Sequence, residues 1–400
     1  MKKKLAAFCL TTAILLTALA GCATATPAGP QVLKFGIAVP LSGPAAGWGI
    51  AIQEILQFRI DEINSAGGLT VDGQNYVWEL VSYDSQYMPT ETVTAVQRLL
   101  DSDQVHFVGI LGAENLLPAQ PLTEAAGAIL WGWAAANQEY VGPEHPLTFM
   151  YAPDAELTAV VYEYLATHNG VRRVISLQPD DTVGQAHSEF ANFAAPLAGV
   201  ELVAEEFVDV RSVTDFYPVL TPLLDMELDL LDVSQCPPGV VGQIIAQARE
   251  LGYAGPVYSA AADMPTLIEM AGWEALEGYY TIPYLTDLTP AQQEFQAGFI
   301  ERYGEDHWVG SLAFTVYDTM TVFSEAIVGA QSLDTTEIAE YMADMTIESV
   351  WGVGGGYFTG SKYYGIDRIY MTPLPLGVVR GGEMVQLAVL EYPSGILSDQ

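Results

Sequence analysis

The sequence predicts an α/β protein of two doubly wound lobes, each a parallel sheet covered by helices. Short apolar runs, typical of buried strands, alternate from Leu33 onward with amphipathic stretches of helical spacing. The same rhythm starts again after Pro153. Such alternation favours parallel sheets with helices on both faces, and 400 residues are enough for two lobes of ordinary domain size.

The first lobe opens with a strand and a helix. Residues 33–41 form the expected strand. Apolar residues then recur at helical spacing, at Ile52, Ile55, Leu56, Ile60 and Ile63, before Gly67 and Gly68 end the helix. The pattern continues with a strand at 76–84, a helix at 89–100, a strand at 106–112, a helix near residue 121 and a strand at 128–134.

The second set repeats this order. In chain sequence it predicts a helix at 157–165, a strand at 173–177, a helix at 185–197, a strand at 200–208, a helix at 214–224, a strand at 228–233, a helix at 240–251 and a strand at 256–259. Helices near 291–303, 312–328 and 336–345 and a strand-rich end at 370–390 then complete both lobes.

The first residues have the pattern of a secretion signal. Three lysines precede an apolar run from Leu5 to Leu19, which is shorter than the ~20 residues that cross a bilayer. We therefore expect residues 1–21 to be a cleaved signal peptide. The tetrapeptide that ends at Cys22 resembles the lipobox of bacterial lipoproteins, which implies that Cys22 is acylated and that 22–31 form a tether. An ordinary signal peptide cut near 23–28 is the alternative.

Composition excludes one class of partner. Lys and Arg number 14 against 49 Asp and Glu, and the formal net charge is −35. Nucleic acid binding needs clustered basic residues, so this class is discarded. A solvated, self-repelling surface explains the acidity, while a cationic ligand and a saline habitat remain open. Besides Cys9 and Cys22 the chain has only Cys236, so no internal disulfide is expected after processing.

Motifs for catalysis are missing from the sequence. No Gly-x-Gly-x-x-Gly follows the first strand, no phosphate-binding Gly-x-x-x-x-Gly-Lys loop exists, and the five histidines form no His-Glu-x-x-His pair. A Gly-x-Ser-x-Gly elbow is absent as well. Asp180 and Asp181 are interpreted as a helix start rather than an acid–base pair. We expect no cofactor, no metal and no enzymatic activity.

Six segments carry a resemblance to a known family. They are VPLSGPAAGWG (39–49), INSAGGL (63–69), VSYDSQYMPTETVTAVQRLL (81–100), AAANQEY (134–140), GQIIAQARELGY (242–253) and EMAGWEALEGYY (269–280). Together they make the chain similar to the branched-chain amino acid binding proteins of ABC importers. The resemblance implies a type I periplasmic-binding fold with ligand between two lobes joined by three hinge crossings. The expected lobes are 32–153 plus 283–350, and 154–282 plus 351–400.

The resemblance also implies binding residues. Trp48 matches the family's cleft aromatic residue, with a core tryptophan as the alternative. Asp154 falls where the family has an acidic residue at the first crossing, directly after Tyr151, and a helix cap is its alternative. Asp263 is the only acid near the place of the family's ammonium-binding glutamate. Tyr87 and Gly112 stand where the family has a disulfide, so packing must stabilise that loop.

Departures from the family concern the ligand. Hydroxyl residues that hold an amino acid's carboxylate are replaced by Gly112-Ala113-Glu114-Asn115 and by Ala134-Ala135-Ala136. Backbone N–H groups around Ala134 and Ala136 could still hold an anion, but Glu114 would repel a carboxylate. Aromatic residues crowd the same strand ends, namely Trp48, Trp131, Trp133 and Tyr151. An uncharged, aromatic or cationic ligand is therefore a candidate beside an amino acid.

The combined interpretation is a monomeric, lipid-anchored solute-binding protein outside the cytoplasm. Its expected partners are a small-molecule ligand, the permease subunits of an ABC importer and, through the anchor, a membrane. A ligand-binding receptor or sensor domain of the same fold is the first alternative. A secreted α/β hydrolase is a remote second one, because it needs a nucleophile or metal constellation.

Overall fold

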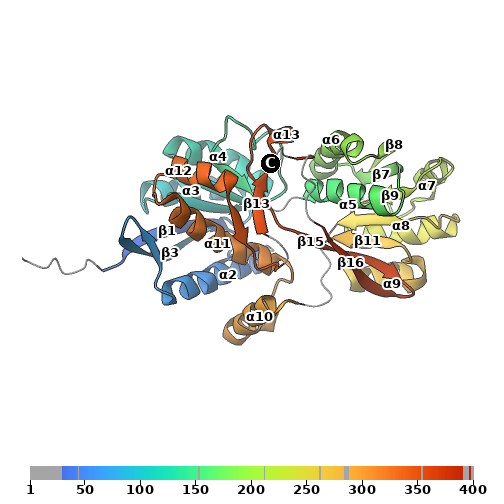
Figure 1. Cartoon of the computed structure of the whole chain (residues 1–400). Helices are drawn as coiled ribbons and strands as arrows, with labels where there is room; N and C mark the ends of the chain where they lie inside the picture. The colour runs from blue at the N-terminus through green and yellow to red at the C-terminus, as the bar shows by residue number, and fades with distance from the viewer. Residues whose placement is uncertain are drawn as a thin grey trace, which may run out of the picture.

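The computed structural model describes residues 29–43, 45–151, 154–210, 212–260, 263–282, 288–352, 355–390 and 396–397 (Figure 1). The expected signal peptide, most of the tether and Cys22 lie outside these residues. Among the described residues, no helix has the length and apolarity that crossing a membrane requires.

Nine strands form the sheet of the first lobe, in the order β12-β13-β14-β6-β5-β4-β1-β3-β2. Their bounds are β1 (Gln31–Val39), β2 (Leu69–Val71), β3 (Gln74–Asp84), β4 (Phe107–Leu111), β5 (Ile129–Trp133), β6 (Thr148–Met150), β12 (Thr346–Glu348), β13 (Gly355–Thr359) and β14 (Ile369–Met371). The six strands from β3 to β14 run parallel. Strand β1 is buried at every position from Phe35 to Val39, as expected for a strand covered on both faces.

Helices cover both faces of this sheet. The helices of this part of the chain are α2 (Ala46–Ser65), α3 (Pro89–Asp101), α4 (Ala113–Ala126), α10 (Pro290–Tyr303), η1 (Glu305–His307), α11 (Leu312–Ala330), α12 (Thr335–Asp344) and α13 (Ser361–Tyr364). The chain moves from β1 through α2 to β3 and then back through α3 to β4 on the other side of β1. Because such crossovers are right-handed, this reversal puts α2 and α3 on opposite faces.

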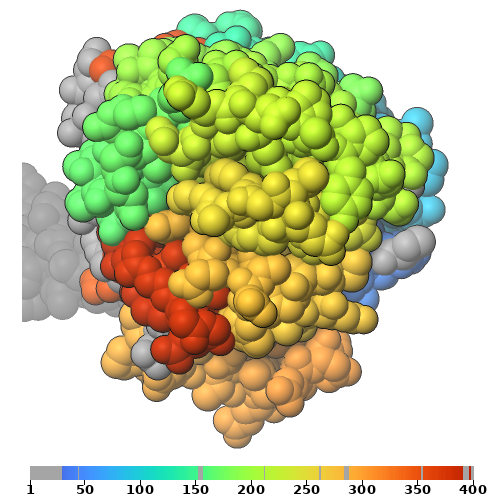
Figure 2. All heavy atoms as spheres, turned by 90° about the vertical axis from the view of Figure 1, so that its right-hand side faces the viewer, coloured from blue at the N-terminus to red at the C-terminus, as the bar shows by residue number. Residues whose placement is uncertain are grey.

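The second lobe has a seven-stranded sheet in the order β16-β15-β11-β10-β9-β7-β8. Its strands are β7 (Arg173–Pro179), β8 (Glu201–Val208), β9 (Leu230–Asp232), β10 (Val257–Ala260), β11 (Tyr279–Ile282), β15 (Leu374–Arg380) and β16 (Glu383–Leu390). Its helices are α5 (Asp154–His168), α6 (Thr182–Leu197), α7 (Tyr217–Leu224), α8 (Pro238–Glu250) and α9 (Met264–Ala275). Figure 2 looks onto this lobe, where the red surface of β15 and β16 lies beside the yellow-to-orange surface of the segments before them.

The chain passes between the sheets three times, after β6, after β11 and after β14. This is the predicted α/β architecture of two parallel-dominated sheets. One expected boundary is wrong. The sequence predicts residues 351–400 in the second lobe, but β13 pairs with β14 and β14 with β6 in the first sheet, and only β15 and β16 join the second. The chain crosses into the second lobe only at 372–373. Before that point Trp351 lies in the core of the first lobe, where its indole N–H donates a hydrogen bond to the Tyr151 hydroxyl at 2.9 Å.

A buried junction joins the lobes beside the crossings. Short helix α13 belongs to the chain of the first lobe, yet its Tyr363 ring packs against Phe190 and Phe193 of α6. The next residue, Tyr364, donates a hydrogen bond to Glu156 of α5, and both side chains are buried. The hydrophobic core is therefore continuous from the first lobe into part of the second.

Candidate functional site

A cavity of about 560 Å³ lies at the carboxyl ends of the first lobe's strands. Its lining comes from the segments that follow β1, β3, β4 and β5, where parallel sheets bind their ligands. The lining residues are Ala45, Trp48, Tyr87, Leu111, Gly112, Ala113, Trp133, Ala134, Ala135 and Val183. Val183 belongs to α6 of the second lobe. The cavity is therefore a cleft between the lobes.

Trp48 is placed by the close packing of α2 on β1. A Cβ atom at Gly49 would lie 1.9 Å from the carbonyl oxygen of Pro40, so only glycine lets the first turn of α2 approach the strand end this closely. Gly49 is buried, while Trp48 is 58% exposed and lines the cavity. The indole is thus a surface group of the cleft and not a core side chain.

Tyr87 lies in a tight turn after β3. The Oδ1 atom of Asp84 accepts hydrogen bonds from the backbone N–H groups of Leu41 and Gln86, both at 2.8 Å. Desolvation raises the pKa of Asp84, but these bonds and one from Ser42 outweigh it and hold the pKa below its ordinary value. An ionised Asp84 therefore fastens the turn to the strand end of β1. In the sequence, Tyr87 stands out only as the residue at the place of a cysteine in the family's disulfide.

The N-terminus of α4 forms another part of the wall. Gly112 precedes this helix with a φ of 90°, and no side chain caps it. Its free N–H groups and the helix dipole favour an electronegative ligand atom. Glu114 is exposed in the first turn and is not in the lining, and Asn115 is buried below it. The amide nitrogen of Asn115 donates to the Leu111 carbonyl at 3.0 Å, and its Oδ1 has no partner among the described residues.

The aromatic residues of β5 divide between cavity and core. Trp133, at the carboxyl end of the strand, lines the cavity and donates from Nε1 to Thr319 at 3.3 Å. Trp131, two residues earlier, is fully buried against Phe323 and Tyr370. Ala134 and Ala135 continue the wall, while Ala136 is buried and outside the lining.

Other expected binding residues lie elsewhere. Tyr151 is buried in the core, where its ring contacts Trp131 and burial raises the pKa of its hydroxyl. Asp263 is exposed and caps α9, since its carboxylate accepts from the backbone N–H and hydroxyl of Thr266. Asp154 begins α5, and its side chain lies outside the described residues. The structure thus brings Trp48 and Ala134 to the cavity and leaves Tyr151 and Asp263 away from it.

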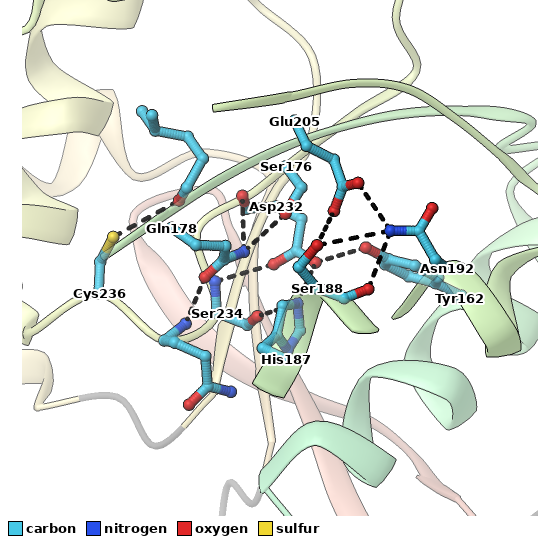
Figure 3. Close-up of polar contacts among 12 residues, drawn as sticks. Tyr162, Ser176, Gln178, His187, Ser188, Asn192, Glu205, Asp232, Ser234 and Cys236 are labelled. Atoms are coloured by element: carbon cyan, nitrogen blue, oxygen red, sulfur yellow. Dashed lines mark hydrogen bonds and ion pairs between the residues drawn. The ribbon is translucent and has the colours of Figure 1, made fainter. Parts of the chain in front are cut away.

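Beneath the second lobe's wall lies a buried polar cluster (Figure 3). Asp232, at the end of β9, accepts from the Tyr162 hydroxyl and from the backbone N–H of Ser234, and its Oδ2 lies 3.3 Å from His187 Nε2. The Ser234 hydroxyl lies 3.1 Å from the same ring nitrogen. Gln178 accepts from the Gln235 N–H at 3.0 Å. These contacts fix the segment after β9 to α5, α6 and β7.

This cluster differs from a hydrolase triad. In a triad the acid and the nucleophile contact different nitrogens of the histidine, whereas Asp232 and Ser234 both contact Nε2. The Nδ1 atom has no partner among the described residues. Burial raises the pKa of the neighbouring Cys236 thiol to about 12, so it is not a thiolate.

One further sequence expectation concerns the same wall. Asp181 is confirmed as a helix cap, because its Oδ1 accepts from the backbone N–H groups of Val183 and Gly184 at 3.0 and 3.1 Å. No group of three or more His, Cys, Asp or Glu side chains within the described part of the chain could hold a metal ion.

The fold and the cleft define the class: a two-lobed protein that holds a small solute between its lobes. A family model described as "Periplasmic binding protein" matches residues 32–372. The chain belongs to this family, whose members are extracytoplasmic solute-binding proteins of ABC transporter type and not enzymes.

Individual relatives agree with this membership. The chain is 23% identical over 326 residues to a "Leu/Ile/Val-binding protein" of Citrobacter freundii, covering 80% of this chain and 85% of the relative. It is 24% identical over 367 residues to "Leu/Ile/Val-binding protein homolog 7" of Brucella suis, covering 84% and 86%.

Solved structures share the fold. A putative branched-chain amino acid ABC transporter protein from Rhodospirillum rubrum superposes with a TM-score of 0.72 at 20% identity, covering 89% of this chain and all of the other. A solute-binding protein of Rhodopseudomonas palustris BisB5, in complex with 3,4-dihydroxybenzoic acid, gives 0.65 at 23% identity, covering 91% and 99%.

Proposed function

We propose that this chain is an extracytoplasmic solute-binding lipoprotein of an ABC importer that captures an amino acid-like, amide or aromatic compound in its cleft. The observation that supports this most is the cavity whose lining includes both lobes, with Trp48 on one side and Val183 on the other. Three crossings connect the lobes and provide a hinge for closure.

The exposed rings of the cleft give closure a driving force. Trp48 is 58% and Tyr87 49% exposed, an unusual state for large apolar side chains that lie in a concave site. A ligand that covers them removes apolar surface from water, which is worth roughly 25 cal/mol per Å². Closure then presents a distinct shape to a permease, and the solute leaves chemically unchanged.

Acylated Cys22 would hold the protein at a membrane surface through the tether 22–31. Each buried acyl methylene contributes about 0.8 kcal/mol to such binding. Full-length protein expressed in bacteria should partition into the detergent phase of a Triton X-114 extraction, while Cys22→Ala should stay in the aqueous phase. Equal partitioning of the two proteins would disprove the anchor and leave the solute-binding proposal intact.

A thermal-shift panel tests the binding function. Amino acids, amides, aromatic acids and polyamines are each added to the purified mature chain, and a true ligand at 100 times its Kd stabilises the folded state by about 2.7 kcal/mol. Trp48→Ala should abolish the shift. Trp273→Ala is the matched control, because Trp273 is exposed on α9 and absent from the cavity lining. A wild-type chain that responds to no compound would contradict the proposal.

A further inference from the structure

We propose that Tyr87 determines specificity in the cleft and that, with Trp48 and Trp133, it selects solutes carrying an aromatic ring and a hydrogen-bond acceptor. This assignment rests on the proposed function and names its ligand class. All three rings line the same cavity. They come from three different strand ends, after β1, after β3 and at the end of β5.

The backbone around Tyr87 is held in an unusual conformation. Gln86 and Tyr87 have φ angles of 51° and 57°, and they are the only two adjacent non-glycine residues with positive φ in the described chain. Side chains hold this pair in place. Asp84 accepts from the Gln86 N–H at 2.8 Å, and the fully buried Ser85 accepts from the Tyr87 N–H at 3.3 Å. Strain that is held this firmly is typical of ligand-contacting turns.

Gly112 leaves the space that the Tyr87 ring occupies. A Cβ atom at position 112 would lie 2.8 Å from the Tyr87 hydroxyl and 3.1 Å from two of its ring carbons. Gly112 also has a φ of 90°, which side-chain-bearing residues rarely adopt. Two segments thus cooperate to place one ring, which lies over the N-terminus of α4 and against the cavity.

The chemistry of the lining favours a ring-bearing ligand. Aromatic rings contact one another in offset or edge-to-face geometries that add to the gain from burial, and an aliphatic side chain has no such geometry. The lining residues that the structure describes include no carboxylate, so they offer no oppositely charged side chain to pair with the ammonium of an amino acid. The Tyr87 hydroxyl has no hydrogen-bond partner among the described residues and can donate to an acceptor on the ring's substituent.

The test compares ligands that differ only in aromaticity. Isothermal titration calorimetry of the mature chain with benzoate, benzamide, cyclohexanecarboxylate and leucine should show at least one of the two aromatic compounds binding roughly tenfold more tightly than the saturated acid and leucine. Tyr87→Phe keeps the ring and should weaken that compound about fivefold through the lost hydrogen bond. Tyr87→Ala should weaken it more than tenfold. Tyr341→Phe is the matched control, because the Tyr341 side chain is exposed on α12 and lies outside the cavity.

A double-mutant cycle tests the coupling of the two segments. Gly112→Ala should weaken binding of the aromatic compound less in the Tyr87→Ala background than in the wild-type background, because the clash with the ring is then absent while the backbone strain at position 112 is common to both. Two results would overturn the role of Tyr87 and leave the binding function intact. One is tighter binding of leucine or cyclohexanecarboxylate than of the aromatic compounds, and the other is wild-type affinity in both Tyr87→Phe and Tyr87→Ala. No binding of any solute, in this set or in the wider panel, would overturn both.

Discussion

Replacing Asp318 by asparagine should flatten the pH dependence of stability. Asp318 lies in α11 with no exposed surface, and it accepts hydrogen bonds from the Ser349 hydroxyl and, at 2.9 Å, from the Val350 N–H. Burial raises the pKa of this carboxyl from 3.8 to about 7, against the opposing effects of Ser349, Val350, Tyr370 and the Arg59 charge.

The sign and size of the effect follow from linkage. A carboxyl with a raised pKa in the folded state contributes stability below pH 3.8, and this contribution is lost as the pH rises through 7. Each pKa unit is worth about 1.36 kcal/mol, so the loss amounts to about 4 kcal/mol. The side-chain oxygen of Asp318→Asn still accepts from Val350 but does not titrate. Its free energy of unfolding relative to wild type should therefore rise by about 4 kcal/mol between pH 4 and pH 8.

Denaturant unfolding followed by tryptophan fluorescence at pH 4, 5, 6, 7 and 8 measures this difference. All other groups titrate in both proteins, so their effects cancel in the comparison. Curves for wild type and Asp318→Asn that stay parallel across the range would refute the assignment of a buried, protonated carboxyl at this position.

Three other outcomes are expected. Tyr364→Phe removes a buried donor to Glu156 between the lobes and should lower the free energy of unfolding by about 1–3 kcal/mol; an unchanged melting temperature would exclude a stabilising junction. Asp232→Asn should destabilise the chain by about 2 kcal/mol at pH 7 through weakened hydrogen bonds. Hydrogen bonds from His187, Tyr162 and Ser234 outweigh desolvation and lower the pKa of Asp232. The stability that its carboxylate contributes is therefore lost only as the pH falls below 3.8. A difference in stability between variant and wild type that persists in acid would contradict this assignment. Raising NaCl from 0.05 to 1 M should increase the melting temperature, since screening reduces repulsion within a chain of net charge −35; a decrease would show that ion pairs dominate.

The alternation of strands and helices was predictable because burial leaves a local signature. Strand β1 is buried on both faces and is apolar at most positions. Four of the five predicted apolar positions of α2 are buried in the structure, and Ile63 is partly buried. The last crossing between the lobes, which follows β14, was not predictable in this way. Strands β13 and β14 are short, and the contacts that keep them in the first lobe are distant in sequence, such as that between Trp351 and Tyr151.

The same distinction applies to the site. Trp48 could be placed because the segment 39–49 resembles the family, and the structure puts it in the first turn of α2, the helix after the first strand. Trp131 and Trp133 look alike in sequence, but only the residue at the strand's end reaches the cavity. The position of the Tyr87 ring depends on the left-handed backbone of Gln86 and Tyr87 and on the space beside Gly112, 25 positions later. Neither feature can be inferred from local spacing. Its position three residues after the end of β3 was the one signal that could have found it.

The two walls of the cleft contribute unequally, and this sets an order of events for the proposed function. All described lining residues except Val183 belong to the first lobe. A solute therefore finds its aromatic and backbone contacts on the first lobe before closure. The second lobe supplies a rigid cover, because Asp181 caps α6 and the cluster around Asp232 fixes the segments behind it. Under the proposed function, the first lobe would therefore determine most of the specificity, and the second lobe would contribute the change of shape for a permease to recognise.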